Sequence, residues 1–108
     1  MISAVRRYKH WRPKKPLADQ RVLEKVLNRH TVMSCPESRL VVAVLARAIV
    51  DCLCLDNHLL RREARQFVLG RDLETWCEWV GLEPWFVRSL ASKAGYLAEE
   101  PGDEREEP

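Results

Sequence analysis

A chain of 108 residues has room for one small domain with a modest core. Hydrophobic residues make up 46% and charged residues 31%, which excludes a wholly disordered chain and favours a folded, soluble one. The net charge of +2 is the sum over a chain whose two ends are oppositely charged. Residues 1–16 carry six cations and no acid, whereas residues 99–108 carry six acids and one cation.

The sequence contains no segment typical of a membrane or secreted protein. Its longest apolar stretch, residues 40–55, is interrupted by Arg47 and Asp51 and is too short to span a bilayer. The cations at the N-terminus are not followed by the apolar segment of a secretory signal. We therefore expect a cytoplasmic location.

The cysteines predict core packing rather than a metal site or a disulfide framework. Cys52 and Cys54 lie two residues apart, so they point away from each other on a helix, and no C-x-x-C pair occurs. Cys35 and Cys77 also have helical, apolar neighbours. We expect these side chains to behave as small buried hydrophobes, with no metal and no cofactor.

The first elements are a basic arm and an amphipathic helix. Two prolines in RPKKP disfavour a helix, so residues 1–16 are expected to be extended. Residues 18–30 predict a helix because four apolar side chains recur at helical spacing, with polar ones opposite. The four are Val22, Leu23, Val26 and Leu27, and the polar ones are Arg21, Glu24, Lys25 and Asn28.

A second helix is predicted over residues 36–56. Ser34 followed by Glu37 forms a capping box, and Pro36 is tolerated in a first turn. The helix is apolar on almost every side, so it must be surrounded by other elements or lie in a subunit interface. We expect both, because so short a domain offers few neighbours.

Three further helices complete an all-α domain of about five helices over residues 17–96. LLRREARQFVLG predicts a helix that stops at Gly70, LETWCEWV predicts a short helix capped by Asp72, and Pro84 opens a last helix to about Lys93. Residues 97–108 predict a disordered acidic tail. In the third helix we expect Leu59, Leu60, Ala64, Phe67 and Val68 to face inward and Arg61, Arg62 and Arg65 to face outward.

The segment at about residues 72–94 fits a helix-turn-helix unit. Such a unit needs a small residue in its first helix, a residue that tolerates positive φ in the turn, and an apolar residue in its second helix. Cys77, Gly81 and Val87 supply these three. The flanking core positions hold Trp76, Val80, Leu82 and Leu90.

Residues 60–94 also carry a longer pattern of residues. Its members are Ala64, Arg65, Phe67, Gly70, Asp72, Cys77, Glu78, Gly81, Leu82, Pro84, Val87 and Arg88. With this pattern the segment resembles small phage and prophage helix-turn-helix DNA-binding proteins. One departure is Glu83, where aspartate would be usual in these proteins, and glutamate is a poorer N-cap. The resemblance implies a mobile-element protein that binds DNA in a host cell, in association with the nucleoid, with a regulatory or packaging role.

If this unit contacts duplex DNA, the outward residues near the start of its second helix make the contacts. These are Trp85, Arg88, Ser89, Ser92 and Lys93, of which Arg88 is the candidate for a guanine edge. The basic arm would neutralise phosphates, and its aromatic side chains could stack or wedge between bases. Its cations are Arg6, Arg7, Lys9, Arg12, Lys14 and Lys15. A homodimer is expected, since one such unit rarely binds tightly alone.

Other interpretations stay open. The corner can be purely structural, or Trp79, Trp85 and Phe86 can bind a protein partner. The acidic tail can simply keep the chain soluble, or it can compete with DNA for the basic surface. No nucleophile, phosphate loop or paired carboxylates occur in a catalytic arrangement, so we expect no enzyme.

Overall fold

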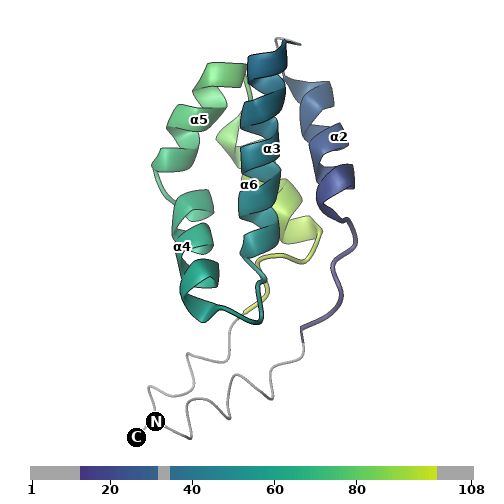
Figure 1. Cartoon of the computed structure of the whole chain (residues 1–108), viewed down its shortest axis with the longest axis vertical. Helices are drawn as coiled ribbons and strands as arrows, with labels where there is room; N and C mark the ends of the chain where they lie inside the picture. The colour runs from purple at the N-terminus through teal and green to yellow at the C-terminus, as the bar shows by residue number, and fades with distance from the viewer. Residues whose placement is uncertain (1–12, 32–34, 100–108) are drawn as a thin grey trace, which may run out of the picture.

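The computed structural model describes residues 13–31 and 35–99, and these residues form five helices and no strand. Figure 1 shows α3 (Pro36–Asp51) between α2 (Gln20–His30) on one side and the pair α4 (His58–Leu69) and α5 (Asp72–Val80) on the other, with α6 (Pro84–Lys93) behind. The predicted all-α class is confirmed. In the described part of the chain, no helix is long and apolar enough to cross a bilayer.

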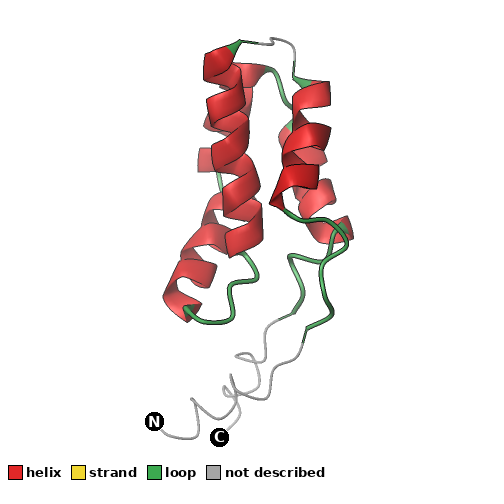
Figure 2. Ribbon diagram, turned by 45° about the vertical axis from the view of Figure 1, so that its right-hand side comes forward, coloured by secondary structure: helices red, strands yellow, loops and turns green. Residues whose placement is uncertain are grey.

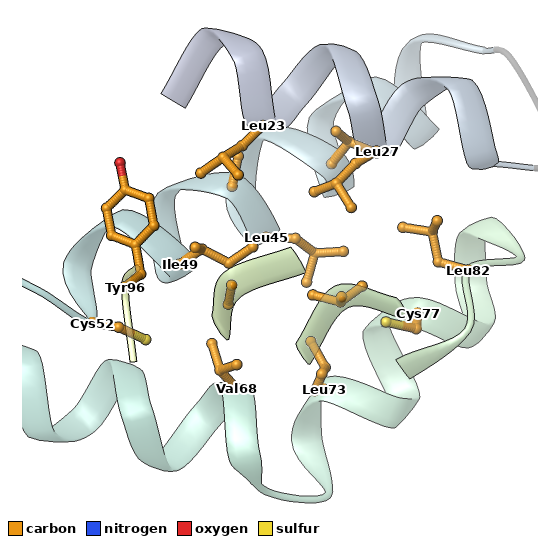
Figure 3. Packing of buried hydrophobic residues seen from close by; sticks show 14 of the residues in the cluster. Leu23, Leu27, Leu45, Ile49, Cys52, Val68, Leu73, Cys77, Leu82 and Tyr96 are labelled. Atoms are coloured by element: carbon orange, nitrogen blue, oxygen red, sulfur yellow. The ribbon is translucent and has the colours of Figure 1, made fainter. Parts of the chain in front are cut away.

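The core lies where α3 meets α2, α4 and α5. Val42, Leu45 and Ile49 of α3 are fully buried or nearly so, and they pack among leucines of α2 and buried side chains of the other helices (Figure 3). The opposite face of α3 is not covered, because Leu40 is 68% exposed and Val44 is 38% exposed. The described helices therefore surround α3 only in part.

The start of α2 is set by local chemistry. The Asp19 carboxylate accepts a hydrogen bond from the Val22 amide at 3.0 Å, so the helix begins at Gln20, two residues later than predicted. Leu23 and Leu27 are completely buried, as their spacing predicted, but Val22 is largely exposed.

α3 begins at Pro36, as predicted, but its N-cap lies one residue after the predicted one. Ser34 lies outside the described residues, and the N-cap is Cys35. The Ser38 hydroxyl accepts from the Cys35 amide at 3.2 Å and donates to the Cys35 carbonyl at 2.9 Å. The capping box proposed for Ser34 and Glu37 is therefore formed by Cys35 and Ser38. The helix ends at Asp51, not at residue 56.

The corner between α5 and α6 is a Schellman motif. Gly81 has φ 74° and ψ 28°, its amide donates to the Glu78 carbonyl, and the Leu82 amide donates to the Cys77 carbonyl at 2.9 Å. Cys77, Leu82 and Val87 are buried, as predicted. Asp72 is the first residue of α5 and not its cap, which is Arg71.

Replacing Gly81 with alanine is expected to lower the free energy of unfolding by about 1 kcal/mol, because a Cβ disfavours the left-handed conformation. Asparagine tolerates this conformation better, so Gly81→Asn should lose less. Thr75→Ala, on the exposed side of α5, should change stability by less than about 0.5 kcal/mol. Urea unfolding of the three variants measures the order, and equal losses at positions 75 and 81 would contradict it.

The segments at either end of the helical region are tied together. The Leu17 amide donates to the Ala94 carbonyl at 2.9 Å, and the Tyr96 hydroxyl donates to the Ala18 carbonyl at 2.6 Å. Figure 2 shows these two loops side by side below the helices. Because of these bonds, the lead-in to α2 and the end of α6 are held at one end of the molecule.

Candidate nucleic-acid interface

Most of the side chains predicted to contact DNA from α6 lie on its outer surface. Trp85 is 65% exposed, and Ser92 and Lys93 are also exposed, whereas Ser89 is half-buried. Their sequence spacing places Trp85, Ser89, Ser92 and Lys93 along one side of the helix. This side of α6 is accessible to a partner molecule.

Arg88 has a different environment. Its Nε donates to the Val68 carbonyl at 2.9 Å and its Nη2 donates to the Gly70 carbonyl at 2.8 Å. The guanidinium thus satisfies carbonyls at the C-terminus of α4, where a positive charge is also favourable. A contact with Glu74 at 3.8 Å is longer and largely exposed. A contact of Arg88 with a base edge stays a prediction, and it would have to use the N–H groups that these two hydrogen bonds leave, or replace them.

Gly70 lies at a position where a side chain would not fit. A Cβ at position 70 would lie 2.5 Å from the Gln66 carbonyl oxygen, a distance at which the backbone must shift. The glycine that was predicted as a helix stop therefore also makes room for the chain to turn where Arg88 binds it.

Two arginines of α4 were placed on the wrong face by the sequence pattern. Arg61 is 1% exposed and donates to the Cys54 carbonyl at 2.7 Å. Arg65 is half-buried and donates to the Cys52 carbonyl at 2.7 Å and to the Tyr96 carbonyl at 3.4 Å. Both satisfy carbonyls just after the end of α3, which explains why they face inward. Only Arg62 of the three is exposed, and Leu59, predicted to be inward, is exposed as well.

The outer surface of α5 and α6 carries more acid than base. Asp72, Glu74 and Glu78 of α5 and Glu83 just before α6 are exposed, against the two cations of α6, Arg88 and Lys93, so residues 72–93 carry a net charge of −2. Negative charge repels DNA phosphates. The summed charge of residues 72–93 therefore does not attract a nucleic acid.

Exposed cations lie instead on α2 and on the segment before it, residues 13–19, which we call the lead-in. Arg21, Lys25 and Arg29 are all exposed and follow one another at intervals of four residues. With a rise of 1.5 Å per residue they form a row about 12 Å long on one side of the helix. Lys14 and Lys15, in the lead-in, are exposed too. We call Arg21, Lys25 and Arg29 the α2 row.

The α2 row was not among the residues predicted to contact DNA. Arg21 and Lys25 were counted only as the polar side of an amphipathic helix, and Arg29 was not named. The available signal was their spacing of four residues directly after the basic arm. The other predicted phosphate contacts, Arg6, Arg7, Lys9 and Arg12, lie outside the described residues.

The exposed tryptophans border two separate pockets. Trp79, 59% exposed, lines a pocket of about 230 Å³ with Glu37 and Val41. Trp85 lines a pocket of about 260 Å³ with Phe86 and His30, and the rings of the last two lie 4.2 Å apart between centroids. Each pocket is large enough for one apolar side chain, so both remain candidates for protein contacts.

The cysteines agree only partly with the prediction of buried packing. Cys52 and Cys77 are buried, whereas Cys35 and Cys54 are half-buried. Burial raises the pKa of the Cys77 thiol to about 11, and Glu83 adds to the rise while Arg88 opposes it. The thiol therefore stays protonated at neutral pH and packs as an apolar side chain.

These observations rest on the chain's own residues. No family model matches the sequence, and neither a curated protein nor a solved structure does.

Proposed function

We propose that this protein binds duplex DNA, with the α2 row and the lead-in holding phosphates. The observation that carries the proposal is the series of exposed cations at Lys14, Lys15, Arg21, Lys25 and Arg29. Neutralising phosphates releases counterions and is the main source of affinity in such complexes. The four other cations of residues 1–16 continue the series toward the N-terminus in the sequence.

In this proposal α5 and α6 act as a helix-turn-helix unit whose second helix lies at a groove. The support is local geometry, since two short helices meet at a three-residue corner with Cys77 and Val87 packed inside it. The outer side of α6 offers Trp85, Ser89, Ser92 and Lys93 to bases and phosphates. Because this unit is acidic, its role in the proposal is to select the position on the DNA. The α2 row supplies the electrostatic attraction for the phosphates.

The resemblance of residues 60–94 to phage and prophage proteins favours a regulatory or packaging role in a host cell. A homodimer fits this role, because two-fold symmetric proteins bind paired half-sites. In this proposal residues 1–12 of the arm, which lie outside the described part of the chain, add phosphate contacts.

Neutralising two cations of the α2 row is expected to weaken DNA binding. In the double variant Arg21→Gln with Lys25→Gln, affinity should fall less steeply with salt. The magnitude of the slope of log affinity against log salt should decrease by about 2, since each phosphate contact contributes about 0.9. The matched control is Arg62→Gln with Arg71→Gln, which removes the same charge from exposed positions on α4 and before α5. Fluorescence anisotropy with a labelled random duplex, between about 50 mM and 200 mM salt, measures both slopes.

The comparison separates a specific surface from net charge. Equal slopes for the two double variants would show that only the total charge matters and would contradict an interface on α2. Absence of binding by the unmodified chain at low salt would contradict DNA binding as a whole.

A protein partner is the second candidate function. The observation that favours it is the exposure of Trp79 and Trp85, since tryptophan is enriched at the centres of protein interfaces. It predicts no binding of the random duplex, so the same titration decides between the two candidates.

A further inference from the structure

One face of α3 is left open by the other helices. Glu37, Leu40, Val44 and Arg47 project from the same side, within about 80° of the helix circumference at 100° per residue. All four are exposed, and Leu40 and Val44 are its apolar members. In Figure 1 no other described helix lies in front of α3. We call these four residues the α3 face.

The apolar and the charged residues of the α3 face are each spaced symmetrically about position 42 of the helix. Leu40 and Val44 each lie two residues from Val42, and Glu37 and Arg47 each lie five residues from it. If a second α3 packs antiparallel with the two-fold axis at the level of Val42, whose own side chain is buried in the core, Leu40 meets the partner's Val44 and Glu37 meets the partner's Arg47. The same two contacts repeat on the other side of the axis, as a two-fold interface requires.

We propose that a second copy of this chain docks on the α3 face in this antiparallel arrangement. The argument for a second copy is that the face is complementary to itself, with acid at its N-terminal end and base at its C-terminal end. A parallel arrangement would place Glu37 against Glu37 and Arg47 against Arg47, which repel each other. Apolar burial at the centre with ion pairs at the rim is the usual anatomy of an interface.

Two neighbouring groups fit this arrangement. Arg47 contacts Asp51 through its Nε at 3.2 Å, yet its side chain is 62% exposed, so other N–H groups of the guanidinium face solvent. Trp79 lines a pocket with Glu37 and Val41, at the edge of the α3 face. It therefore stands beside the position that the partner's Arg47 would occupy and can extend the apolar contact.

The size of the face predicts a reversible dimer. Stable interfaces bury about 1,600 Å² in total, and one helix face against its copy gives less than that. We therefore expect the proportion of dimer to rise with protein concentration and to fall with added salt, because two ion pairs close the rim.

Charge reversal tests the arrangement by sedimentation equilibrium of the full chain without DNA. Glu37→Arg and Arg47→Glu should each be at least tenfold weaker in self-association, since each places like charges opposite one another twice. An equimolar mixture of the two variants should dimerise again, because every contact then joins opposite charges. Arg62→Glu, an exposed reversal on α4, is the control and should associate like the unmodified chain. Circular dichroism verifies that all variants keep their helices.

Each outcome decides the proposal. Recovery in the mixture but in neither single variant supports the antiparallel two-fold contact. A chain that is monomeric throughout, or variants that dimerise unchanged, or variants that stay apart when mixed, would overturn it. Leu40→Ser, which removes the apolar centre without changing charge, should also dissociate the dimer. The inference does not depend on DNA binding, and because DNA is absent its failure is distinguishable from failure of the proposed function.

Discussion

Replacing Arg61 with alanine is expected to lower the free energy of unfolding by about 3 kcal/mol, the largest effect we predict. Arg61 is almost completely buried, and its Nη1 donates to the Cys54 carbonyl at 2.7 Å. Truncation leaves that carbonyl in the chain segment between α3 and α4 without this donor and opens a cavity between the two helices. In a domain of this size the loss corresponds to a fall in melting temperature of more than about 10 °C.

Arg62→Ala is the matched control, because Arg62 is the neighbouring arginine on the same helix and is exposed. It should change stability by less than about 0.5 kcal/mol. Arg61→Met separates packing from hydrogen bonding, because methionine restores most of the volume and none of the donors. Thermal unfolding followed by circular dichroism measures all three. Equal losses for Arg61→Ala and Arg62→Ala would show that the buried hydrogen bond contributes little.

The helices themselves could be predicted from sequence because their signals are local. Leu23 and Leu27 repeat at helical spacing, and both are buried. Gly81 marks the corner because only glycine adopts positive φ at little cost, and it does so here. Such features depend on a few neighbouring residues, and no knowledge of the rest of the fold is needed.

The arginines of α4 and α6 could not be placed in this way. A charged side chain on a helix predicts a solvent-facing position, because a buried charge is costly without partners. The partners of Arg61, Arg65 and Arg88 are backbone carbonyls at helix ends, between 7 and 31 residues away in sequence. Every residue has a backbone carbonyl, so the sequence does not indicate which carbonyls lack a partner. Only the packing of α3, α4 and α6 shows which of them the arginines contact.

The candidate interface was predicted in part for the same reason. The exposure of Trp85 and Lys93 on α6 follows from helical spacing. The α2 row is equally regular. Its cations become candidates for an interface only when their charge is compared with the net negative charge of residues 72–93. Whether a charge contributes to an interface depends on the sum over neighbouring elements.

The second large effect is expected for Arg88→Ala, which should lower the free energy of unfolding by about 2 kcal/mol. Its guanidinium donates to the Val68 and Gly70 carbonyls and so joins α6 to the end of α4. Hydrogen bonds from a charged donor at a helix C-terminus contribute more than neutral ones. Its distant contact with the exposed Glu74 adds little.

The control for Arg88→Ala is Lys93→Ala, which removes an exposed positive charge from the last turn of the same helix. We expect it to cost less than about 0.5 kcal/mol. Arg88→Lys should recover only part of the loss, because one ammonium group lacks the planar fork that spans two carbonyls. Urea unfolding measures the series. A stable Arg88→Ala variant would contradict the structural role and leave the base-contacting role as the reason for this residue.

The same variants test whether Arg88 takes part in the proposed DNA binding. If Arg88 only holds α6 against α4, Arg88→Ala loses stability, and its DNA affinity at a temperature where it is fully folded stays close to that of the unmodified chain. If Arg88 also contacts a base, affinity falls under those conditions while Lys93→Ala weakens binding to all sequences alike. The Val68 and Gly70 carbonyls use the Nε and one N–H group of Nη2, so N–H groups remain on the guanidinium. A base contact through the remaining groups would leave α4 unchanged, whereas one that replaces the carbonyls would require α4 to loosen at Gly70 when DNA binds. Faster amide hydrogen exchange at the end of α4 in the complex would reveal that change.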